Sequence, residues 1–526
     1  MRLNLTNKIF LAIFLLALIL RFYKLGNIPP SLDWDENSNA YNAYSILKTG
    51  KDEYRNKFPL YNRSFNDYKP PLYMYLSVPV VAVFGLTPFS ARFVSAICGL
   101  LTIVTLFFLI KKLFKNNQKA DMIALSSAFL ITIAPWTIMF SRIGLEANLG
   151  LFIVTLAIAL FLYGLENKYL LLSSALFFGL SLYAYHAERI FSPVMILALV
   201  FIFRKEFLKI EKKIIIIFSL IFIIFAVPLF VFMPKEALLQ RFNISSSDFI
   251  KENLAKSSLL QLQDEQQGFG LLKVLHNRRI TLINSYFENY IFHFDANFLF
   301  VKGDSNLRHH LNNFGMLNIF FLPLILLGVY RAVKTPKIST VLLVWLAVSV
   351  FPASLATPSP HAIRSYLMII PLIAFSGIGF LSLFELKYKF PLIILSVFIF
   401  YSFFHFIYEY TTQYPVYSAF DWQYGFSDAA KYTKQLVGDR KFEKIYIDSR
   451  LEQAYIFWLF NLKYDPGSFQ QNGSRDHFDK YYFTGTPAHQ SEVLVSYANN
   501  FPEGYNILTT FDYPDGNHAV KIGYPK

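Results

Sequence analysis

The sequence has a single cysteine and few charged residues. A single cysteine, Cys98, excludes a disulfide within the chain. It lies in an apolar stretch, where we interpret it as a packing residue. Charged residues make up 16% of the chain and hydrophobic residues 54%, whereas soluble proteins carry about 25% charged residues. Together with a mean hydropathy of +0.38, this composition excludes a soluble protein and predicts a polytopic α-helical membrane protein.

Three motifs of common enzyme classes are also missing. The sequence contains no Walker loop, no dinucleotide-binding glycine fingerprint and no H-E-x-x-H, which argues against nucleotide hydrolysis and zinc proteolysis. The net charge of +14 suggests nucleic acid, but the basic residues gather in every second connection between apolar stretches. Because that distribution follows membrane topology, we expect membrane lipid as a partner and no nucleic acid.

Eleven apolar stretches of about 17 to 25 residues are long enough to cross a bilayer. The positive-inside rule places the amino terminus in the cytoplasm, and an odd number of spans then places the carboxyl terminus outside. The long loops 26–88 and 233–312 also face outside. We interpret the first stretch as a retained signal anchor because no small-residue cleavage site follows it. The stretches cover residues 9–25, 89–110, 122–140, 147–165, 168–185, 188–203, 214–232, 314–330, 339–356, 363–383 and 390–408.

The last part of the chain is less hydrophobic and carries its own pattern. We expect a membrane domain over residues 1–410 and a small extracytoplasmic α/β domain over 415–526. Within the latter, the periodicity predicts helices over 428–437 and 453–461, and strands over 444–447, 492–497 and 505–510. In the first long loop, residues 38–48 suit a helix, and the apolar segment 70–84 suits a second helix in the membrane interface.

Three acids, Asp33, Asp35 and Glu36, follow the first apolar stretch by about ten residues. Clustered carboxylates repel one another unless a cation, a proton or a substrate hydroxyl occupies the site; a solvated loop is the alternative interpretation. Asp33-Trp34-Asp35 spells the D-x-D that chelates a divalent cation in many sugar transferases. A divalent cation is therefore a candidate cofactor, with its site unknown.

Histidines offer further metal candidates. His293 and Asp295 are two residues apart, and His309 and His310 are adjacent. Imidazole and carboxylate are common ligands of divalent transition metals.

Other ionisable residues lie at the same ends of the apolar stretches as the three acids. Such residues cost several kcal/mol near a membrane unless they are paired or functional. Pairing of Glu188 with Arg189 or Arg142 is the structural alternative. The residues are Arg142 and Glu146 in one loop, His186, Glu188 and Arg189 in a second, and His361 and Arg364 in a third.

The outer side of a membrane lacks nucleotides, so a synthetic enzyme there needs a donor that is already activated and delivered in the lipid. A polyprenyl-phosphate sugar meets this need. Transfer from it requires a carboxylate to take the proton of the acceptor hydroxyl, and cations to stabilise the departing phosphate. Asp35 or Glu36 is the candidate base. The candidate cations are Lys69, Arg142, Arg189 and Arg364, with arginine suited to bidentate phosphate contacts.

Five motifs, in this order along the chain, carry a resemblance to a known family. They are Asp35-Glu36, Lys69-Pro70-Pro71-Leu72, Ala91-Arg92-Phe93-Val94-Ser95-Ala96, Arg142 with Glu146, and His361-Ala362-Ile363-Arg364. With these motifs the chain resembles the membrane-embedded GT-C glycosyltransferases, in the group that includes protein O-mannosyltransferases and the lipid A aminoarabinose transferase.

The resemblance implies a polyprenyl-phosphate donor, inversion at the anomeric carbon, Asp35 as the base and Glu146 as a second acid. It also brings His361 into the set of donor phosphate-binding residues. One position departs from the family pattern: Tyr68 precedes Lys69, where aminoarabinose transferases tend to carry an acid. This departure weighs against a metal site like theirs and against lipid A modification.

We therefore expect inverting transfer of a sugar to a hydroxyl of a protein, glycan or lipid acceptor, at the outer face of the cytoplasmic membrane. A transporter or flippase for a lipid-linked saccharide is the alternative from another class. It predicts ionisable residues near the middle of the membrane and broken helices in both halves. A non-catalytic scaffold that displays the C-terminal domain is the third interpretation. The informative charges cluster at the outer ends of the stretches, which favours the enzyme.

Overall fold

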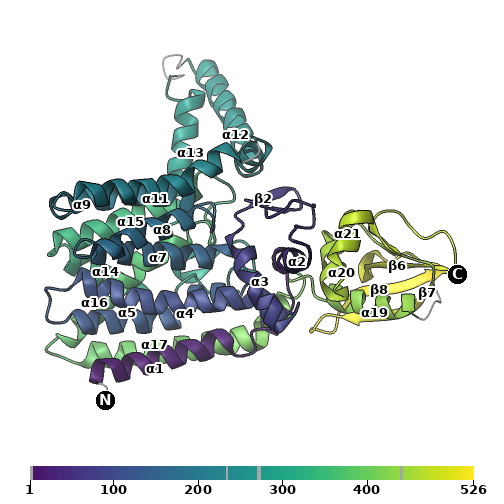
Figure 1. Ribbon diagram of the computed structural model, residues 1–526, viewed down its shortest axis with the longest axis horizontal. Coiled ribbons are helices and arrows are strands. Elements are labelled where there is room, and N and C mark those ends of the chain that lie inside the picture. Colours follow the sequence, from purple (N-terminus) through teal and green to yellow (C-terminus); the bar gives the residue numbers. More distant parts are fainter. Residues whose placement is uncertain (1–3, 233–234, 269–273, 439–441) are drawn as a thin grey trace. The chain divides into compact units, whose positions relative to one another are not determined.

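The computed structural model describes residues 4–232, 235–268, 274–438 and 442–526. These residues form two compact units (Figure 1). Unit 1 comprises Met1–Ile19, Gly99–Met139 and Ala147–Phe403, and unit 2 comprises Leu20–Cys98, Phe140–Glu146 and Phe404–Lys526. Both units are therefore assembled from segments that lie far apart in the sequence.

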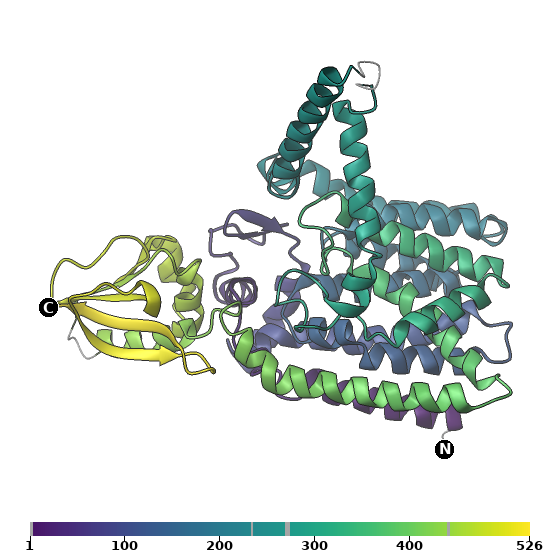
Figure 2. The same cartoon turned by 180° about the vertical axis from the view of Figure 1, so that it is seen from behind.

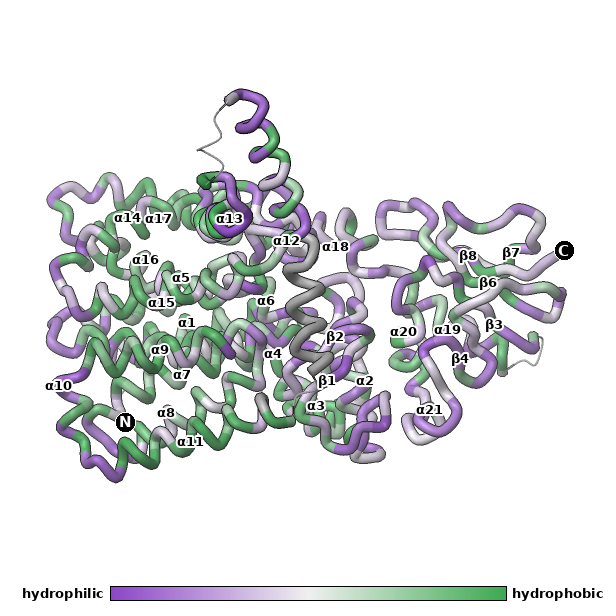
Figure 3. The backbone as a smooth tube through the Cα atoms, turned by 90° about the horizontal axis from the view of Figure 1, so that it is seen from above, coloured by the Kyte–Doolittle hydropathy of each residue, from purple (hydrophilic) through white to green (hydrophobic). Residues whose placement is uncertain are grey.

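Unit 1 is a bundle of apolar helices. Figure 3 shows most of these helices as hydrophobic along most of their length, with polar residues concentrated at their ends. The helices of this unit, some of which extend into unit 2, are α1 (Leu5–Phe22), α4 (Pro88–Leu113), α5 (Ala120–Ile133), α6 (Pro135–Ser141), α7 (Glu146–Gly164), α8 (Lys168–Ser181), α9 (Glu188–Ile202), α10 (Arg204–Phe207), α11 (Lys212–Val231), α12 (Lys235–Gln266), α13 (Arg278–Phe292), η2 (Asn297–Val301), α14 (Phe321–Ala332), α15 (Pro336–Ser354), η3 (Tyr366–Met368), α16 (Ile369–Phe384) and α17 (Phe390–Tyr408).

A helix overlaps each of the eleven predicted apolar stretches. Among the described residues, seven helices are long and apolar enough to cross a membrane, and α5 with α6, bent by 62° at their junction, makes an eighth. The helices α8, α9 and α14 have 14, 15 and 12 residues, fewer than the roughly 17 that a span needs. The protein is thus a multi-pass membrane protein, and the number eleven stays a prediction.

The helix α16 forms the centre of the bundle. In its apolar window 83% of the residues are buried, against 17% in α1 and 11% in α11, which are peripheral. Figures 1 and 2 show α1 and α17 along one edge of the bundle. Glycines allow α14 to approach α16 closely: a Cβ at Gly328 would lie 1.8 Å from the carbonyl oxygen of Phe375, and one at Gly379 would lie 2.0 Å from that of Leu324. Small residues commonly permit such close packing between membrane helices.

The predicted outer loop 233–312 contains two long helices that were not predicted. The helices α12 and α13 form a hairpin that projects from the bundle (Figure 1). The helix α13 is tied to α15, because Tyr290 Oη donates to Ala347 O at 3.0 Å and Asn289 Nδ2 donates to Ser354 O at 3.4 Å. The hairpin thereby fixes the start of the segment that leads through η2 to His309.

Unit 2 combines the segment after α1 with the C-terminal α/β domain. Its elements are α2 (Trp34–Thr49), β1 (Asn62–Ser64), β2 (Asp67–Lys69), α3 (Leu72–Phe84), η4 (Glu409–Gln413), α18 (Tyr414–Tyr417), α19 (Phe426–Gly438), β3 (Lys444–Ile447), α20 (Ala454–Leu462), α21 (Pro466–Asn472), β4 (His477–Phe478), β5 (Tyr481–Tyr482), β6 (Glu492–Tyr497), η5 (Ala498–Asn500), β7 (Tyr505–Asp512) and β8 (His518–Pro525). The strands β1 and β2 form an antiparallel hairpin.

The helix α2 begins four residues earlier than predicted. Asp33 Oδ1 accepts from Glu36 N at 2.8 Å, and Glu36 Oε2 accepts from Asp33 N at 3.3 Å. This reciprocal capping box satisfies two backbone N–H groups that a helix start leaves unpaired. It therefore starts the helix at Trp34 and places Asp35 in the first turn.

The C-terminal domain is built on a six-stranded mixed sheet with the order β4-β5-β3-β6-β8-β7. The strand β3 pairs in parallel with β5 and β6, and the remaining neighbours pair in antiparallel. The five predicted elements of this domain are all present, with β3 and β6 at the predicted bounds. The strands β4, β5 and β8 and the helix α21 were not predicted.

The helix α2 and the C-terminal domain share one hydrophobic core. Tyr41 packs its ring edge-on against Phe469, with centroids 6.5 Å apart, and its hydroxyl donates to Tyr464 O at 3.1 Å. Gln470 Nε2 donates to Ser45 Oγ at 3.0 Å. The C-terminal domain thus holds the helix that carries Asp35.

Glu53, buried in the same unit, makes stability depend on pH. Burial raises the pKa of Glu53 from 4.5 to about 7, against the opposing hydrogen bonds from Asn42 and Tyr455. Because this pKa is higher in the folded state, protonation of Glu53 favours folding, and this contribution disappears as the pH rises from about 4.5 through about 7.

We therefore expect Glu53→Gln to raise the unfolding temperature at pH 8 and to leave it nearly unchanged at pH 4.5, because the amide stays neutral throughout. Thermal unfolding monitored by tryptophan fluorescence at both pH values checks this. An equal shift at both pH values would contradict the assignment.

Candidate carboxylate site and histidine cluster

Asp35, Lys69 and Glu146 come together in unit 2. The ammonium of Lys69, at the end of β2, donates to Asp35 Oδ1 and lies 4.0 Å from Glu146 Oε1. The Asp35 side chain is 28% exposed, whereas Lys69 and Glu146 are 11% and 7% exposed. Asn39 Nδ2 orients Glu146 by donating to its Oε1 at 3.0 Å. Asp35 is thus the accessible acid of this cluster.

Lys69 stays protonated in this setting. Burial alone would lower the pKa of its ammonium, but the negative charges of Asp35 and Glu146 and the hydrogen bond to Asp35 outweigh burial and raise the pKa above its usual range. Two carboxylates around one buried ammonium form a compact site in which Lys69 keeps its charge.

Glu36 points elsewhere, into a fully buried ion pair with Arg92. The pair is bidentate: Arg92 Nε donates to Glu36 Oε1 at 2.8 Å and Nη2 donates to Oε2 at 3.0 Å, and neither side chain is exposed. Gly144 N donates to the same Oε1 at 2.7 Å. Arg92 also donates to the carbonyl oxygens of Leu25, Pro29 and Ser31. Glu36 therefore joins three segments of unit 2.

Arg142 is anchored to backbone carbonyls. Its Nη1 donates to Leu20 O at 2.9 Å, and its Nη2 donates to Tyr23 O at 2.7 Å and to Ile28 O at 3.1 Å. Its Nε donates to Tyr410 Oη at 3.3 Å, and the residue is 3% exposed. These contacts pin the end of α1 to the segment that carries Glu146.

Three other predicted cations and ligands belong to unit 1. Arg189 Nε donates to Leu182 O at 3.2 Å, and Arg364 Nη1 donates to Thr357 O at 2.9 Å. His361 lies three residues before Arg364 in the same loop, and its side chain is 15% exposed. The candidate phosphate-binding residues are thus divided between the units, with Lys69 and Arg142 in unit 2.

One aspartate and two histidines of unit 1 form a second cluster. Asp304, His309 and His361 each offer a ligand atom, and these atoms lie within 4.8 Å of one another. This is the only such group of three among the described residues. Burial would raise the pKa of Asp304, but the hydrogen bond and charge of His309 and the charge of His361 outweigh burial and hold it below its usual range.

The other metal candidates from the sequence are engaged differently. Asp33 caps α2 and Asp35 binds Lys69, so the D-x-D does not converge on one point with a third ligand in the described part of the chain. Asp295 is exposed and Oδ1 accepts from Asn297 N. Burial lowers the pKa of His293 to about 4, which keeps its ring neutral.

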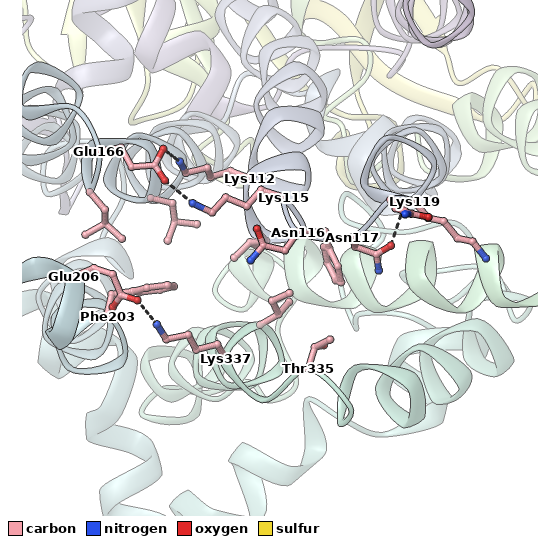
Figure 4. A pocket seen from close by; sticks show the side chains of 16 residues that line it. Lys112, Lys115, Asn116, Asn117, Lys119, Glu166, Phe203, Glu206, Thr335 and Lys337 are labelled. Carbon is pink, nitrogen blue, oxygen red and sulfur yellow. Dashed lines mark hydrogen bonds and ion pairs between the residues drawn. The ribbon is translucent and has the colours of Figure 1, made fainter.

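A cavity of about 830 Å³ lies beside the last turn of α4 and the first turn of α15 (Figure 4). Its polar rim consists mainly of ion pairs: Lys112 and Lys115 bind Glu166 at 2.6 and 2.5 Å, and Lys337 binds Glu206 at 2.5 Å. Lys119, also in the rim, binds Glu385, which directly follows α16. The lysines are thus neutralised by nearby acids, and the cavity contains none of the predicted site residues.

Several residues of these sites were not predicted to take part. Arg92 appeared in the sequence only as part of a family motif, and its ion pair with Glu36 was not predicted. A buried arginine requires a buried partner of this kind. Asp304 carried no assigned role, because a single aspartate in a loop has no spacing signal. Trp422, which had no predicted role in the site, is fully buried and donates to Tyr414 Oη at 2.9 Å. The next residue, Gln423, accepts from Trp34 N at 3.1 Å.

Comparison with known proteins supports the same class. Residues 68–232, less than half of the chain, match the family described as dolichyl-phosphate-mannose-protein mannosyltransferase. No curated protein sequence matches the chain. ArnT from Cupriavidus metallidurans bound to undecaprenyl phosphate is similar in structure, with a TM-score of 0.55 and 11% identity over 99% of this chain and 98% of ArnT.

The archaeal oligosaccharyltransferase AglB from Archaeoglobus fulgidus, in complex with an inhibitory peptide and a dolichol-phosphate, gives a TM-score of 0.52 and 13% identity over 86% of this chain and 63% of AglB. The Archaeoglobus fulgidus oligosaccharyltransferase in complex with Zn and sulfate gives a TM-score of 0.50 and 14% identity over 86% of this chain and 61% of that enzyme. The chain therefore spans about three fifths of the length of these oligosaccharyltransferases.

These likenesses define the fold: the chain is a polytopic GT-C membrane protein with a C-terminal sheet domain. Together with the family match, they support a glycosyltransferase. The resemblance to protein O-mannosyltransferases and aminoarabinose transferases that the five motifs indicated is thereby confirmed.

Proposed function

We propose that the protein transfers a sugar from a polyprenyl-phosphate donor to an acceptor hydroxyl, with inversion at the anomeric carbon. The observation that carries the proposal is the cluster of Asp35, Lys69 and Glu146, in which only the Asp35 carboxylate is substantially exposed. The ligands named with two structural relatives, undecaprenyl phosphate and a dolichol-phosphate, support the choice of donor.

In the proposed reaction, the hydroxyl oxygen of the acceptor attacks the anomeric carbon while the Asp35 carboxylate accepts the proton of that hydroxyl. The bond between that carbon and the phosphate oxygen breaks, and the polyprenyl phosphate leaves with the bonding electrons. A single displacement inverts the configuration. A positioned base contributes about 10² to 10⁴ in rate, and cations that neutralise the developing phosphate charge add to it.

We assign donor phosphate binding to Lys69, Arg189, His361 and Arg364. An ammonium has three N–H donors, so Lys69 can bind Asp35 and a phosphate oxygen at once. Glu146 keeps Lys69 in place from the other side. Arg142 and Glu36 were predicted to contact the donor and the acceptor, but their buried contacts favour a positioning role, in which they fix the segments that carry Glu146 and Asp35.

The proposed location is the outer face of the cytoplasmic membrane, with the C-terminal domain outside. Lys8 lies near the start of α1, whereas the acids Asp33, Asp35 and Glu36 follow its end. The next apolar helix, α4, has the basic residues Lys111 and Lys112 in its last turn. The positive-inside rule places those basic ends in the cytoplasm. The acceptor is a hydroxyl of a protein, glycan or lipid.

Product stereochemistry tests the reaction type. With purified protein, a donor of known anomeric configuration should yield a product of the opposite configuration and one polyprenyl phosphate per sugar transferred, as read by NMR and lipid chromatography. Retention of configuration, or release of sugar without a phosphate product, would overturn the proposed single displacement.

Lys69→Ala should impair donor use more than acceptor use. Loss of a charge-assisted phosphate contact is expected to raise the donor KM about tenfold or more, with the acceptor KM changed by less than about twofold. We expect Arg364→Ala to act in the same direction. Donor saturation curves at fixed acceptor concentration measure the effect.

Two exposed lysines supply matched controls for these variants. Lys57 lies in the same loop as Lys69, and Lys302 lies in the segment that packs near the loop of Arg364. Their alanine variants should match the wild type. Unchanged donor saturation in Lys69→Ala and Arg364→Ala would remove both residues from the phosphate site.

A further inference from the structure

We propose that Asp304, His309 and His361 bind a divalent transition-metal ion, with Zn²⁺ as the best fit, and that this ion ties the segment 302–314 to the loop 355–366. All three residues belong to unit 1 and none belongs to the carboxylate cluster of unit 2. His361 is also one of the residues proposed to bind the donor phosphate, but the observations behind the metal site and its readouts, metal content and thermal unfolding, need no transfer assay.

The separations of the ligand atoms suit a bound ion. His309 Nδ1 lies 2.9 Å from Asp304 Oδ2, and His361 Nδ1 lies 4.0 Å from the same oxygen. Ligand atoms bound tetrahedrally at about 2.0 to 2.2 Å from Zn²⁺ are about 3.3 Å apart. Side-chain movements of less than about 1 Å therefore bring the three groups onto one ion. The two imidazole rings are tilted by 46° with centroids 5.3 Å apart, so they do not stack face to face.

The strongest single observation is at His361. Its Nδ1 is buried and has no hydrogen-bond partner among the described residues, although it points toward the Asp304 carboxylate. A buried nitrogen without a partner is costly. A metal ion between His361 Nδ1 and Asp304 Oδ2 would supply the partner that His361 Nδ1 lacks.

Neighbouring groups hold the ligands in place, as outer contacts do in metal sites. Asp304 Oδ2 accepts from Ala362 N at 2.7 Å, and Oδ1 accepts from Asn306 N at 3.0 Å. The backbone N–H of His361 donates to His293 Nε2 at 3.2 Å, and His293 Nδ1 donates to Asn289 O at 2.8 Å. Both nitrogens of His293 are thus used, so His293 supports the site from the end of α13 and is not a ligand.

The ligand set selects the kind of ion. Two imidazoles and one carboxylate suit Zn²⁺ and its neighbours in the first transition row, whereas Ca²⁺ and Mg²⁺ prefer six or more oxygen ligands. Three protein ligands leave a fourth position for water or an anion. The ion would join the segment 302–314, which follows α13 and η2, to the loop that carries Arg364.

Metal content of the full-length protein tests the inference. Protein purified in detergent through a tag without histidines is stripped with chelator, incubated with ZnCl₂ and freed of unbound metal by gel filtration. Mass spectrometry of the metal should find about one zinc per wild-type chain, and His361→Ala, His309→Ala and Asp304→Asn should each lose most of it. His310→Gln and His489→Ala are controls, since neither residue is in the triad.

Thermal unfolding supplies a second readout that does not depend on any transfer assay. Chelator should lower the unfolding temperature of the wild type and leave that of His361→Ala unchanged, since the variant has no ion to lose. The inference would be overturned if the wild type and the triad variants had equal zinc content. It would also be overturned if chelator left the unfolding temperature of the wild type unchanged. Loss of zinc in His310→Gln with retention in His309→Ala would show that the ligands are wrongly assigned.

Discussion

Asp35→Asn should abolish most sugar transfer while leaving the protein folded. The amide has the volume of the carboxylate but cannot accept the proton of the acceptor hydroxyl, so turnover should fall by about 10² to 10⁴. Folding should persist because Asp35 is 28% exposed and the capping box that starts α2 is formed by Asp33 and Glu36. Initial rates with saturating donor, on protein that elutes as a single species, measure the effect.

Asp33→Asn is the matched control for this variant. It makes the same chemical change two residues earlier, and asparagine caps a helix about as well as aspartate. Its turnover should stay near that of the wild type. A folded Asp35→Asn protein with nearly normal turnover would remove Asp35 as the base and would point to Glu146. Equal loss in both variants would instead point to a metal bound by the D-x-D.

Glu36→Gln should destabilise the protein far more than any exposed charge does. The variant leaves the buried guanidinium of Arg92 without its counter-charge, and breaking a buried pair by removing one partner costs about 3 to 5 kcal/mol. We expect a marked fall in the unfolding temperature and in the yield of folded protein. Replacing Arg92 by methionine in the same chain removes the uncompensated charge and should restore part of the stability.

Glu166→Gln provides the comparison at an exposed pair. Glu166 binds Lys112 and Lys115, but its side chain is 58% exposed, and exposed pairs contribute less than about 1 kcal/mol. Thermal unfolding of the three variants in the same detergent tests the difference. A Glu36→Gln protein that is as stable as the wild type and inactive would contradict the positioning role and would return Glu36 to the list of candidate bases.

The helices and the C-terminal domain were largely predictable because their signals are local. Apolar stretches give the membrane helices directly, and the apolar runs at 444–447 and 492–497 became β3 and β6 at those bounds. The strand β8 was missed because Gly523 and Pro525 resemble turn residues, yet the antiparallel pairing with β6 and β7 makes it a strand. Tertiary pairing of this kind leaves no local signal.

The sequence named the residues of the candidate site, but it indicated only part of their arrangement. The sequence placed Asp35, Lys69 and Glu146 among the important residues, but it did not indicate which acid is accessible. That depends on Arg92 and Gly144, which are far from Glu36 in the sequence and bury it. Likewise, Asp304 gained a candidate role only when folding brought it to His309 and His361.

The most direct test of the account supplies the protein in proteoliposomes with radiolabelled polyprenyl-phosphate monosaccharides and native membrane extract as acceptor. The account predicts that label enters a protein, glycan or lipid product, that one donor of the panel is used, and that Asp35→Asn gives no label above background. Movement of intact donor across the bilayer without any labelled product, by folded wild-type protein, would contradict it and would identify a transporter instead.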